Sequence, residues 1–432
     1  MRKEPAAAWQ RDQMVRMSRS PVAWSSALRS SLPPSLAVSF ACFVGLALYD
    51  GALGTAWPSI RHSLALPIGD LGLVQLAGTA GFLCSSAISG GVSARAGRAG
   101  AIAGAGALAA CGLAAYAASP DLALLLLAAA VIGVGAGHLE PGVQSHVALT
   151  ASPRGMNLLH ACYGMGATIG PLLITGLLVL GWSWRLAYVV ILGVDLAVAL
   201  AVLRYRGDFN ATTPSRGPAS SRGPARANRL PRSSPAGPAG EAVAPLSRVA
   251  VATALLLFFV YCGVEMSTGQ WAFTFFTVAR HLAPGLAGLL VAGYWASLTL
   301  ARLAAAAIGS RISSSLLLAL SAGGAVVGEV LMLWEPVTAI GVAGLLIAGA
   351  SLGPAFPLMM SRTASWAQTA RVSSVIGWQS AAACVGVAVP SAVAGLLIEN
   401  FGLGALMPYL CALAGLFFLL QLAALRILGE RG

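Results

Sequence analysis

The sequence predicts an all-α membrane protein with twelve transmembrane helices in two parallel six-helix repeats. Hydrophobic residues make up 57% of the 432 residues, and charged residues only 9%. A soluble domain carries about 25% charged residues, so this chain cannot cover a soluble surface of its own size. Twelve apolar runs are each long enough to cross a bilayer core, and they divide evenly about one polar segment near the middle of the chain.

The predicted spans follow one another with short connections, which indicates antiparallel neighbours. Turn residues occupy two of these connections, at 119–121 and 334–336. The twelve runs cover residues 36–58, 69–92, 99–118, 121–147, 157–180, 183–203, 248–279, 286–309, 314–334, 336–360, 372–398 and 403–427.

The polar segments set the predicted domain boundaries. Residues 205–247 are rich in proline and arginine and contain little that is apolar, so we expect a disordered tether between the halves. The first half then covers 35–204 and the second half 248–427. A basic tail of residues 1–34 precedes them, and a short tail of residues 428–432 follows.

The basic residues predict the orientation of the chain. Of the 26 lysines and arginines, only Arg61, Arg185 and Arg280 fall on one side when the loops are numbered alternately. The positive-inside rule therefore places both termini and the tether in the cytoplasm. The preference for arginine over lysine and the many alanines are typical of a GC-rich bacterial genome, so we expect a bacterial inner-membrane protein. Because the basic residues lie between apolar runs, the net charge of +12 does not indicate a nucleic-acid partner.

The two halves repeat short patterns in the same order. Residues 49–51 read Tyr-Asp-Gly, and residues 261–263 read Tyr-Cys-Gly. Pro171 and Pro390 are each followed at the same distance by Gly-Leu-Leu. A parallel repeat of six helices is typical of one class of secondary transporters.

Five acidic residues fall inside the predicted spans, where a charge costs roughly 3 kcal/mol or more and therefore points to function. Asp50, Glu140 and Glu265 have polar neighbours in the sequence, and we predict that they couple transport to protons. Asp195 has no such neighbours and is interpreted as structural. Glu329 lies near the end of its span and is expected to reach the interface.

Four stretches of the sequence carry a resemblance to a known family. They are Tyr261-x-Gly263-x-Glu265-x-x-x-Gly269-x-Trp271, Asn157-Leu-Leu-His160-Ala-x-Tyr163-Gly164-x-Gly166, Gly353-Pro354-x-Phe356-Pro357 and Gly377-x-Gln379. With the order of the spans across the whole chain, they resemble the major facilitator superfamily, and in detail its fucose–proton symporter group. Members of that group carry acids in their first and fourth helices, where Asp50 and Glu140 lie.

The resemblance implies two further elements. The loop after the second span matches the family's gating motif at Gly90, Arg95, Gly97 and Arg98, but alanine stands at the acidic position, and Arg311 lies in the repeat-related loop. The fifth span contains Gly-x-x-x-Gly-Pro, formed by Gly166, Gly170 and Pro171. This motif indicates either ordinary close packing of helices or the hinge that the family has at this helix.

The predicted function is secondary transport by alternating access, without enzymatic activity, metal or cofactor, and driven by a proton gradient. We expect proton-coupled symport of a small polar solute such as a sugar by a monomer embedded in lipid. Proton-antiport efflux of a drug or metabolite is one alternative, and a non-transporting sensor or scaffold is the other. The expected substrate-binding residues are Asn157, His160, Glu265, Gln270, Trp271 and Gln379. Trp271 and its counterpart Trp57 could instead anchor the helices at the membrane interface.

Overall fold

The computed structural model describes residues 33–151, 153–211, 247–308, 311–366 and 372–429. Within these ranges the chain forms helices joined by short turns and loops, and it contains no strand. Twelve helices are long and apolar enough to cross a membrane, so the predicted fold class is confirmed. Most of the two predicted tails and most of the predicted tether lie outside the described residues.

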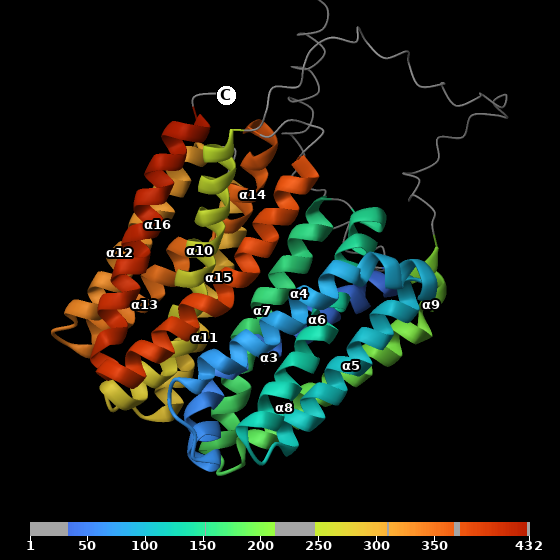
Figure 1. Cartoon of the computed structure of the whole chain (residues 1–432), viewed down its shortest axis with the longest axis horizontal. Coiled ribbons are helices and arrows are strands. Elements are labelled where there is room, and N and C mark those ends of the chain that lie inside the picture. Colours follow the sequence, from blue (N-terminus) through green and yellow to red (C-terminus); the bar gives the residue numbers. More distant parts are fainter. Residues whose placement is uncertain (1–32, 152, 212–246, 309–310, 367–371, 430–432) are drawn as a thin grey trace, which may run out of the picture.

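Each half contains six spans, which run up and down through the bundle (Figure 1). The first half consists of α3 (Pro34–Leu64), α4 (Asp70–Ala96), α5 (Arg98–Ala118), α6 (Leu122–Thr150), α7 (Pro153–Val179) and α8 (Trp184–Arg204). The second half consists of α10 (Arg248–Thr274) with the π-helical turn η1 (Phe275–Ala279), α11 (Pro284–Ile308), α12 (Ser314–Trp334), α13 (Thr338–Leu352) with α14 (Ala355–Trp366), α15 (Val372–Phe401), and, after the short turn η3 (Leu403–Ala405), α16 (Leu406–Gly429).

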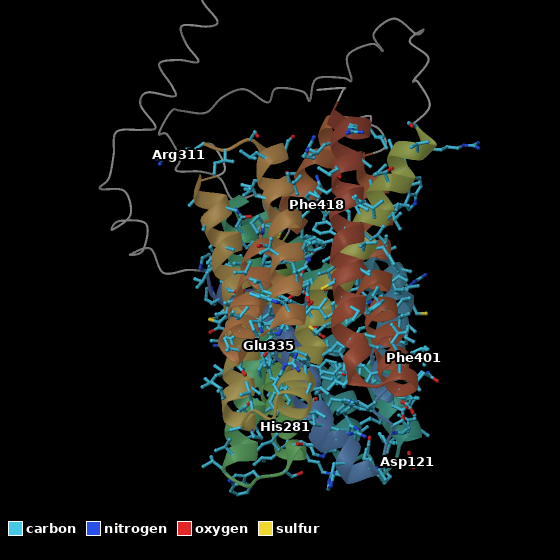
Figure 2. The ribbon with its side chains drawn as sticks, turned by 90° about the vertical axis from the view of Figure 1, so that its left-hand side faces the viewer. Asp121, His281, Arg311, Glu335, Phe401 and Phe418 are labelled. Atoms are coloured by element: carbon cyan, nitrogen blue, oxygen red, sulfur yellow. The ribbon has the colours of Figure 1, made fainter. Side chains whose placement is uncertain are left out.

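The helices of the bundle end at two opposite faces, one on each side of the expected membrane. Asp121, His281 and Phe401 lie toward one end, here called the loop end, and Arg311 lies toward the other, here called the linker end (Figure 2). At the loop end Asp121 caps α6, because its carboxylate accepts a hydrogen bond from the Leu124 backbone N–H at 2.9 Å.

The tenth predicted span is broken into two helices, where the sequence indicated one run. Pro354 has no backbone N–H and ends α13 at Leu352. The Gly353 carbonyl oxygen instead accepts a hydrogen bond from Arg302 Nε of α11 at 3.1 Å. The break is therefore stabilised by a side chain from a neighbouring helix.

The predicted tether also begins differently from the expectation. Residues 206–210 form a short helix, α9 (Arg206–Asn210), which docks on the start of α5. Arg98 Nη1 donates to the Phe209 carbonyl oxygen at 3.0 Å, and the Asn210 side chain accepts from the Ala99 backbone N–H at 3.0 Å. The Phe209 ring stacks on buried His146 with ring centroids 4.4 Å apart.

The halves contact each other mainly through three helix pairs, α3–α10, α4–α15 and α7–α11. Small residues allow these backbones to approach closely. A β-carbon added at Gly72 would lie 2.8 Å from the Ala392 β-carbon, and one added at Gly54 would lie 2.7 Å from the Gln270 α-carbon. At the loop end the Gly69 backbone N–H also donates to the Glu399 carboxylate at 3.0 Å. The halves are thus closed against each other at the loop end.

The glycines of the Gly-x-x-x-Gly-Pro motif pack α7 on α3 inside the first half. A β-carbon at Gly166 would lie 2.9 Å from the Ala47 β-carbon, and one at Gly170 would lie 2.6 Å from the Leu48 carbonyl oxygen. Helix α7 continues through Pro171 to Val179. These contacts correspond to the packing interpretation of the motif, and the hinge interpretation stays a prediction.

Candidate transport site

A cavity of about 200 Å³ lies in the interior of the bundle, mainly among helices α3, α4 and α6 of the first half, with smaller contributions from α5, α7 and α8. The second half completes its wall with side chains from α10 and α15, among them Met266, Gln270 and Cys384. A rocking motion of one half against the other would therefore change the shape of this cavity.

Three acidic side chains line the cavity, each from a different helix. They are Asp50 of α3, Glu140 of α6 and Asp195 of α8. Asp50 Oδ2 accepts a hydrogen bond from the Tyr163 hydroxyl at 2.7 Å, and Glu140 Oε1 accepts one from Gln144 Nε2 at 2.9 Å. The structure thus brings two of the three predicted proton-coupling residues to one cavity.

Asp195 is an acidic residue of this cavity that sequence reasoning did not assign to the site. It was interpreted as structural because its own helix offers no polar neighbour, yet it lines the same cavity as Asp50 and Glu140. Gly45 of α3 makes room for it, since a β-carbon at Gly45 would lie 2.7 Å from Asp195 Oδ1. Within the described part of the chain, no side chain forms a hydrogen bond or ion pair with its carboxyl group. The only sequence signal was the acid itself at bilayer depth.

Two buried glutamines, Gln75 and Gln270, are among the residues that line the cavity. Gln270, a predicted substrate-binding residue, donates from Nε2 to the Asp50 backbone carbonyl oxygen at 2.8 Å and so links α10 to α3. Its Oε1 is buried without a partner, as is Oε1 of Gln75 on α4. The side chains are 2% and 7% exposed, so solvent does not readily satisfy these acceptors.

Glu265 is not among the residues that line the cavity. Its carboxylate instead faces Arg302 of α11, with 3.8 Å between Oε1 and Nη2, and both side chains are largely buried. The Tyr294 hydroxyl donates to the Glu265 backbone carbonyl oxygen at 2.7 Å. Glu265 therefore belongs to a charge pair inside the second half, separate from the acid-lined cavity. The role of Glu265 in proton coupling stays a prediction.

Trp271 is fully buried, and its indole N–H donates to the Ser391 carbonyl oxygen at 3.1 Å. The repeat-related Trp57 is equally buried and donates to the Ile68 carbonyl oxygen at 2.9 Å. The alternative interpretation of both residues as interface anchors is wrong, because neither ring is exposed. The Trp271 indole links α10 to α15, and the Trp57 indole links α3 to the turn before α4. Neither side chain lines the cavity.

The remaining predicted substrate-binding residues also lie away from the cavity lining. Asn157 is exposed near the start of α7, and His160 packs edge-on against Phe43 with ring centroids 5.9 Å apart. Gln379 is buried inside the second half, where it accepts from the Thr363 hydroxyl at 2.9 Å and borders a separate cavity of about 30 Å³. Sequence reasoning placed them on the right helices but could not orient their side chains.

Glu329 requires a correction. The sequence placed it at the interface, but the structure buries it completely, with 0% exposure. Its Oε1 accepts a hydrogen bond from the Thr268 hydroxyl at 2.6 Å, and its Oε2 has no partner among the described residues. Glu329 therefore lies against α10 inside the second half.

The predicted gating loop is ordered, and Arg98 takes part in the docking of α9. Gly97 has φ +73°, a left-handed backbone conformation that glycine adopts without strain, and it separates α4 from α5. Arg95 and Arg311 are exposed, and a β-carbon at Gly90 would meet nothing within 4 Å. The observed contacts of this loop lie within the first half, and its gating role stays a prediction.

The two six-helix halves and the cavity that both of them line define a membrane-spanning secondary transporter. A family model for the Major Facilitator Superfamily matches residues 38–284, which is more than half of the chain, and the chain belongs to this family. The sequence-based resemblance to that superfamily is therefore confirmed. A comparison with curated proteins finds no match.

Several solved structures share the fold at low sequence identity. The nucleoside transporter NupG matches with a TM-score of 0.71 at 12% identity, over 91% of this chain and 99% of that chain. A bacterial homolog of the human lysosomal transporter Spinster, in an inward-facing and occupied conformation, matches with a TM-score of 0.68 at 12% identity, over 92% of this chain and 96% of that chain. FucP in the outward conformation matches with a TM-score of 0.58 at 18% identity, over 90% of this chain and 98% of that chain. At such identities these structures demonstrate the fold alone.

Proposed function

We propose that this protein couples the movement of a small solute to protons, with Asp50 and Glu140 as the proton-carrying groups. The observation that carries the proposal is that both carboxyl groups line one cavity, which is completed by side chains from both halves. A carboxyl group gains and loses a proton without other chemistry, and acids at bilayer depth mark proton relays in transporters.

The contact between Asp50 and the second half supplies a physical route for coupling. Gln270 holds the Asp50 backbone carbonyl oxygen, and Tyr163 holds the Asp50 side chain. When the halves rock apart, the Gln270 bond has to break or follow Asp50. The protonation state of Asp50 and the position of the second half can therefore influence each other through adjacent atoms.

The orientation and the cellular location follow from the basic residues. We propose that the linker end faces the cytoplasm, that both termini lie there, and that the protein works as a monomer in a bacterial inner membrane. The closed loop end then faces the periplasm, so this conformation would exchange solute with the cytoplasm.

Two modes of coupling are compatible with this site. The resemblance to fucose–proton symporters favours symport of a small polar solute such as a sugar. The third acid, Asp195, favours proton antiport as the second candidate, because a positively charged solute and protons would compete for the same carboxylates. The direction of proton movement when solute is added distinguishes the two modes.

The test uses purified protein in vesicles that contain a pH-sensitive dye. The solutes are fucose, a nucleoside and an organic ammonium ion, added separately under an imposed pH gradient. Asp50→Asn and Glu140→Gln should each abolish solute-driven proton movement, while binding survives in at least one variant. Asp121→Asn is the matched control, because asparagine caps a helix as well as aspartate does.

Two outcomes would contradict the proposal. If both variants move protons and concentrate solute at the normal rate, Asp50 and Glu140 are not the coupling site, and Glu265 takes their place as the leading candidate. If the unmodified protein binds a solute but moves neither solute nor protons, the sensor or scaffold alternative replaces transport.

A further inference from the structure

The break in the tenth span lies next to the charge pair of the second half. Arg302 of α11 reaches both, with Nε 3.1 Å from the Gly353 carbonyl oxygen and Nη2 3.8 Å from Glu265 Oε1. We propose that Arg302 is a positioning residue that transmits the charge of Glu265 to the break, so that α14 acts as a gate at the linker end. This inference rests on the proposed function only in that a gate requires a transporter, and it assigns a role to residues outside the cavity.

The sequence leaves the tenth span without two of its backbone hydrogen bonds. In an uninterrupted helix the carbonyl oxygens of Ala350 and Gly353 accept from residues 354 and 357, and both of these are prolines, which have no N–H. Gly353 still has helical dihedral angles, with φ −48° and ψ −49°. A bend at this point therefore costs neither backbone bond, because both are already absent.

Side chains from two neighbouring helices hold the break in its present form. The Tyr261 hydroxyl of α10 donates to the Leu352 carbonyl oxygen at 3.1 Å, beside the bond from Arg302 to Gly353. Gly353 also packs tightly on α11, since a β-carbon added there would overlap the Leu298 carbonyl oxygen. The angle between α13 and α14 is therefore set by α10 and α11, and less by the backbone of the tenth span itself.

The contact between Arg302 and Glu265 is looser than a direct charge-assisted hydrogen bond. Such bonds are about 2.7–2.9 Å long, whereas Nη2 and Oε1 are 3.8 Å apart here. The guanidinium group is thus shared between two acceptors. Moving about 1 Å toward an ionised Glu265 would draw it away from Gly353, and a neutral Glu265 leaves the Gly353 bond without a competitor.

Helix α14 extends from the break to the linker end of the bundle (Figure 1). Arg362 Nη1 of α14 donates to Ser315 Oγ at 3.1 Å, near the start of α12. Arg311, four residues before Ser315, lies at the linker end (Figure 2). The backbone at Gly353 lies about 2 Å from the helix axis, and Ser361 lies about 10 Å further along it. A movement of about 1 Å at the break can therefore become one of about 2–4 Å at Ser361.

Arg302 also faces the first half, across the contact between α7 and α11. A β-carbon added at Gly164 of α7 would lie 2.8 Å from Thr299 Cγ2 of α11. Because the two helices run in opposite directions, His160 and Arg302 each lie about one turn further toward the linker end, and they interact electrostatically. Arg302 therefore lies at the boundary between the halves as well as at the break.

The titratable groups beside the charge pair come from three helices. Glu265 and Arg302 are accompanied by the side chains of Tyr261, Cys262, Tyr294, Tyr163 and His160. Tyrosine and cysteine are largely uncharged at neutral pH, so only Glu265 and His160 can readily change their charge next to Arg302. A variant of His160 therefore has to accompany the variants of the pair.

The test measures distances across the linker end by pulsed electron paramagnetic resonance. It uses the purified full-length protein with its seven native cysteines replaced. Labels at the exposed Arg206 of α9 and Ser361 of α14 report on the gate, and labels at Arg206 and Arg311 report on the rest of the second half. We expect Glu265→Gln to shift the Arg206–Ser361 distance by about 2–4 Å and to leave the Arg206–Arg311 distance unchanged.

Two control variants identify the group that is responsible. Glu329→Gln also neutralises a buried acid of the second half, but the partner of Glu329 is Thr268, so this variant should shift neither distance. His160→Gln removes the other titratable group beside Arg302, and Glu265→Gln should produce the same shift in its presence.

Variants of Arg302 test the connection itself. In Arg302→Gln the guanidinium group is lost, so adding Glu265→Gln should cause no further shift. Arg302→Lys serves where Arg302→Gln or Glu265→Gln fails to fold. It keeps a positive charge near Glu265, but its single ammonium nitrogen replaces a planar group that reaches both acceptors. Arg302→Lys alone should therefore shift the Arg206–Ser361 distance, with no further change on adding Glu265→Gln.

The inference is overturned if the Arg206–Ser361 distance stays the same in folded Glu265→Gln or Arg302→Lys, or if both distances shift together. It is also overturned if Glu329→Gln produces the shift, or if Glu265→Gln still adds its full shift in an Arg302 variant.

Failure of the inference differs from failure of the proposed function. If α14 responds as expected while Asp50→Asn and Glu140→Gln still move protons and concentrate solute normally, the gate stands and the proposed coupling site fails. If those two variants lose proton movement while α14 does not respond to Glu265→Gln, the proposed function stands and the gate fails.

Discussion

The close approach of Gly72 to Ala392 predicts that one added methyl group shifts the conformational equilibrium of the transporter. In Gly72→Ala the new β-carbon would lie 2.8 Å from the Ala392 β-carbon, across the closed contact between α4 and α15. Carbon atoms in contact prefer about 3.5–4.0 Å, so the halves would have to separate by roughly 1 Å at this point. Overpacking of this kind costs about 1–3 kcal/mol. The conformation closed at the loop end would therefore lose a factor of roughly 5–150 in population.

Two glycines on the first half provide controls with the same substitution. Gly81→Ala also creates a clash, but against the Ala130 carbonyl group inside the first half, so it should lower the melting temperature without opening the loop end. Gly104→Ala meets nothing within 4 Å and should do neither. The higher helix propensity of alanine acts in every conformation and cancels from the comparison between conformations.

The measurement is the distance between spin labels at the loop end, recorded by pulsed electron paramagnetic resonance. Labels at the exposed His62 and Asn400 report on the two halves in a background in which the seven native cysteines are replaced. Gly72→Ala should add a population with a longer distance, and the two control variants should keep the original distribution. An unchanged distribution in Gly72→Ala, or an equal shift in Gly81→Ala, would refute the reasoning from this contact.

Three further predictions concern other parts of the molecule. Glu265→Gln leaves its buried arginine partner uncompensated, so we expect folded protein whose transport rate falls about tenfold or more in vesicle uptake, and normal uptake would make Glu265 structural. Thr268→Val removes the donor to the buried carboxylate of Glu329 and should destabilise the fold by about 1–2 kcal/mol in thermal unfolding, whereas an unchanged melting temperature would mean that this bond contributes nothing. A reporter fused at Arg216, which lies outside the described residues, should read cytoplasmic, and a periplasmic signal would contradict the orientation derived from the basic residues.

The sequence by itself determined the number, length and order of the spans. Inside a bilayer each backbone polar group has to be satisfied within its own helix, so the length of an apolar run specifies a span with little help from the rest of the fold. The agreement is close even at the ends in the ninth span, predicted at 314–334 and observed at Ser314–Trp334, whereas the first span, predicted at 36–58, extends to Leu64. It was weaker where a side chain from another helix intervened, as Arg302 does at the break between α13 and α14.

The depth of the acids could also be predicted, but their surroundings could not. Glu329 lies five residues before the end of α12, about 8 Å along the helix axis, as the sequence indicated. Its direction was missed, because the side chain points inward to Thr268. Asp195 was passed over because its cavity neighbours come from other helices, including Gly45 of α3.

Only the tertiary structure decided which polar residues share the cavity. A helix that is apolar around its whole circumference carries no periodic signal of which face turns inward, because lipid and protein interior are equally apolar. The sequence therefore did not predict that Gln75 lines the cavity, or that Gln379 lies inside the second half instead. The rotation of each helix about its axis is set by close contacts of small residues, such as Gly166 with Ala47, and those contacts exist only once the helices have packed.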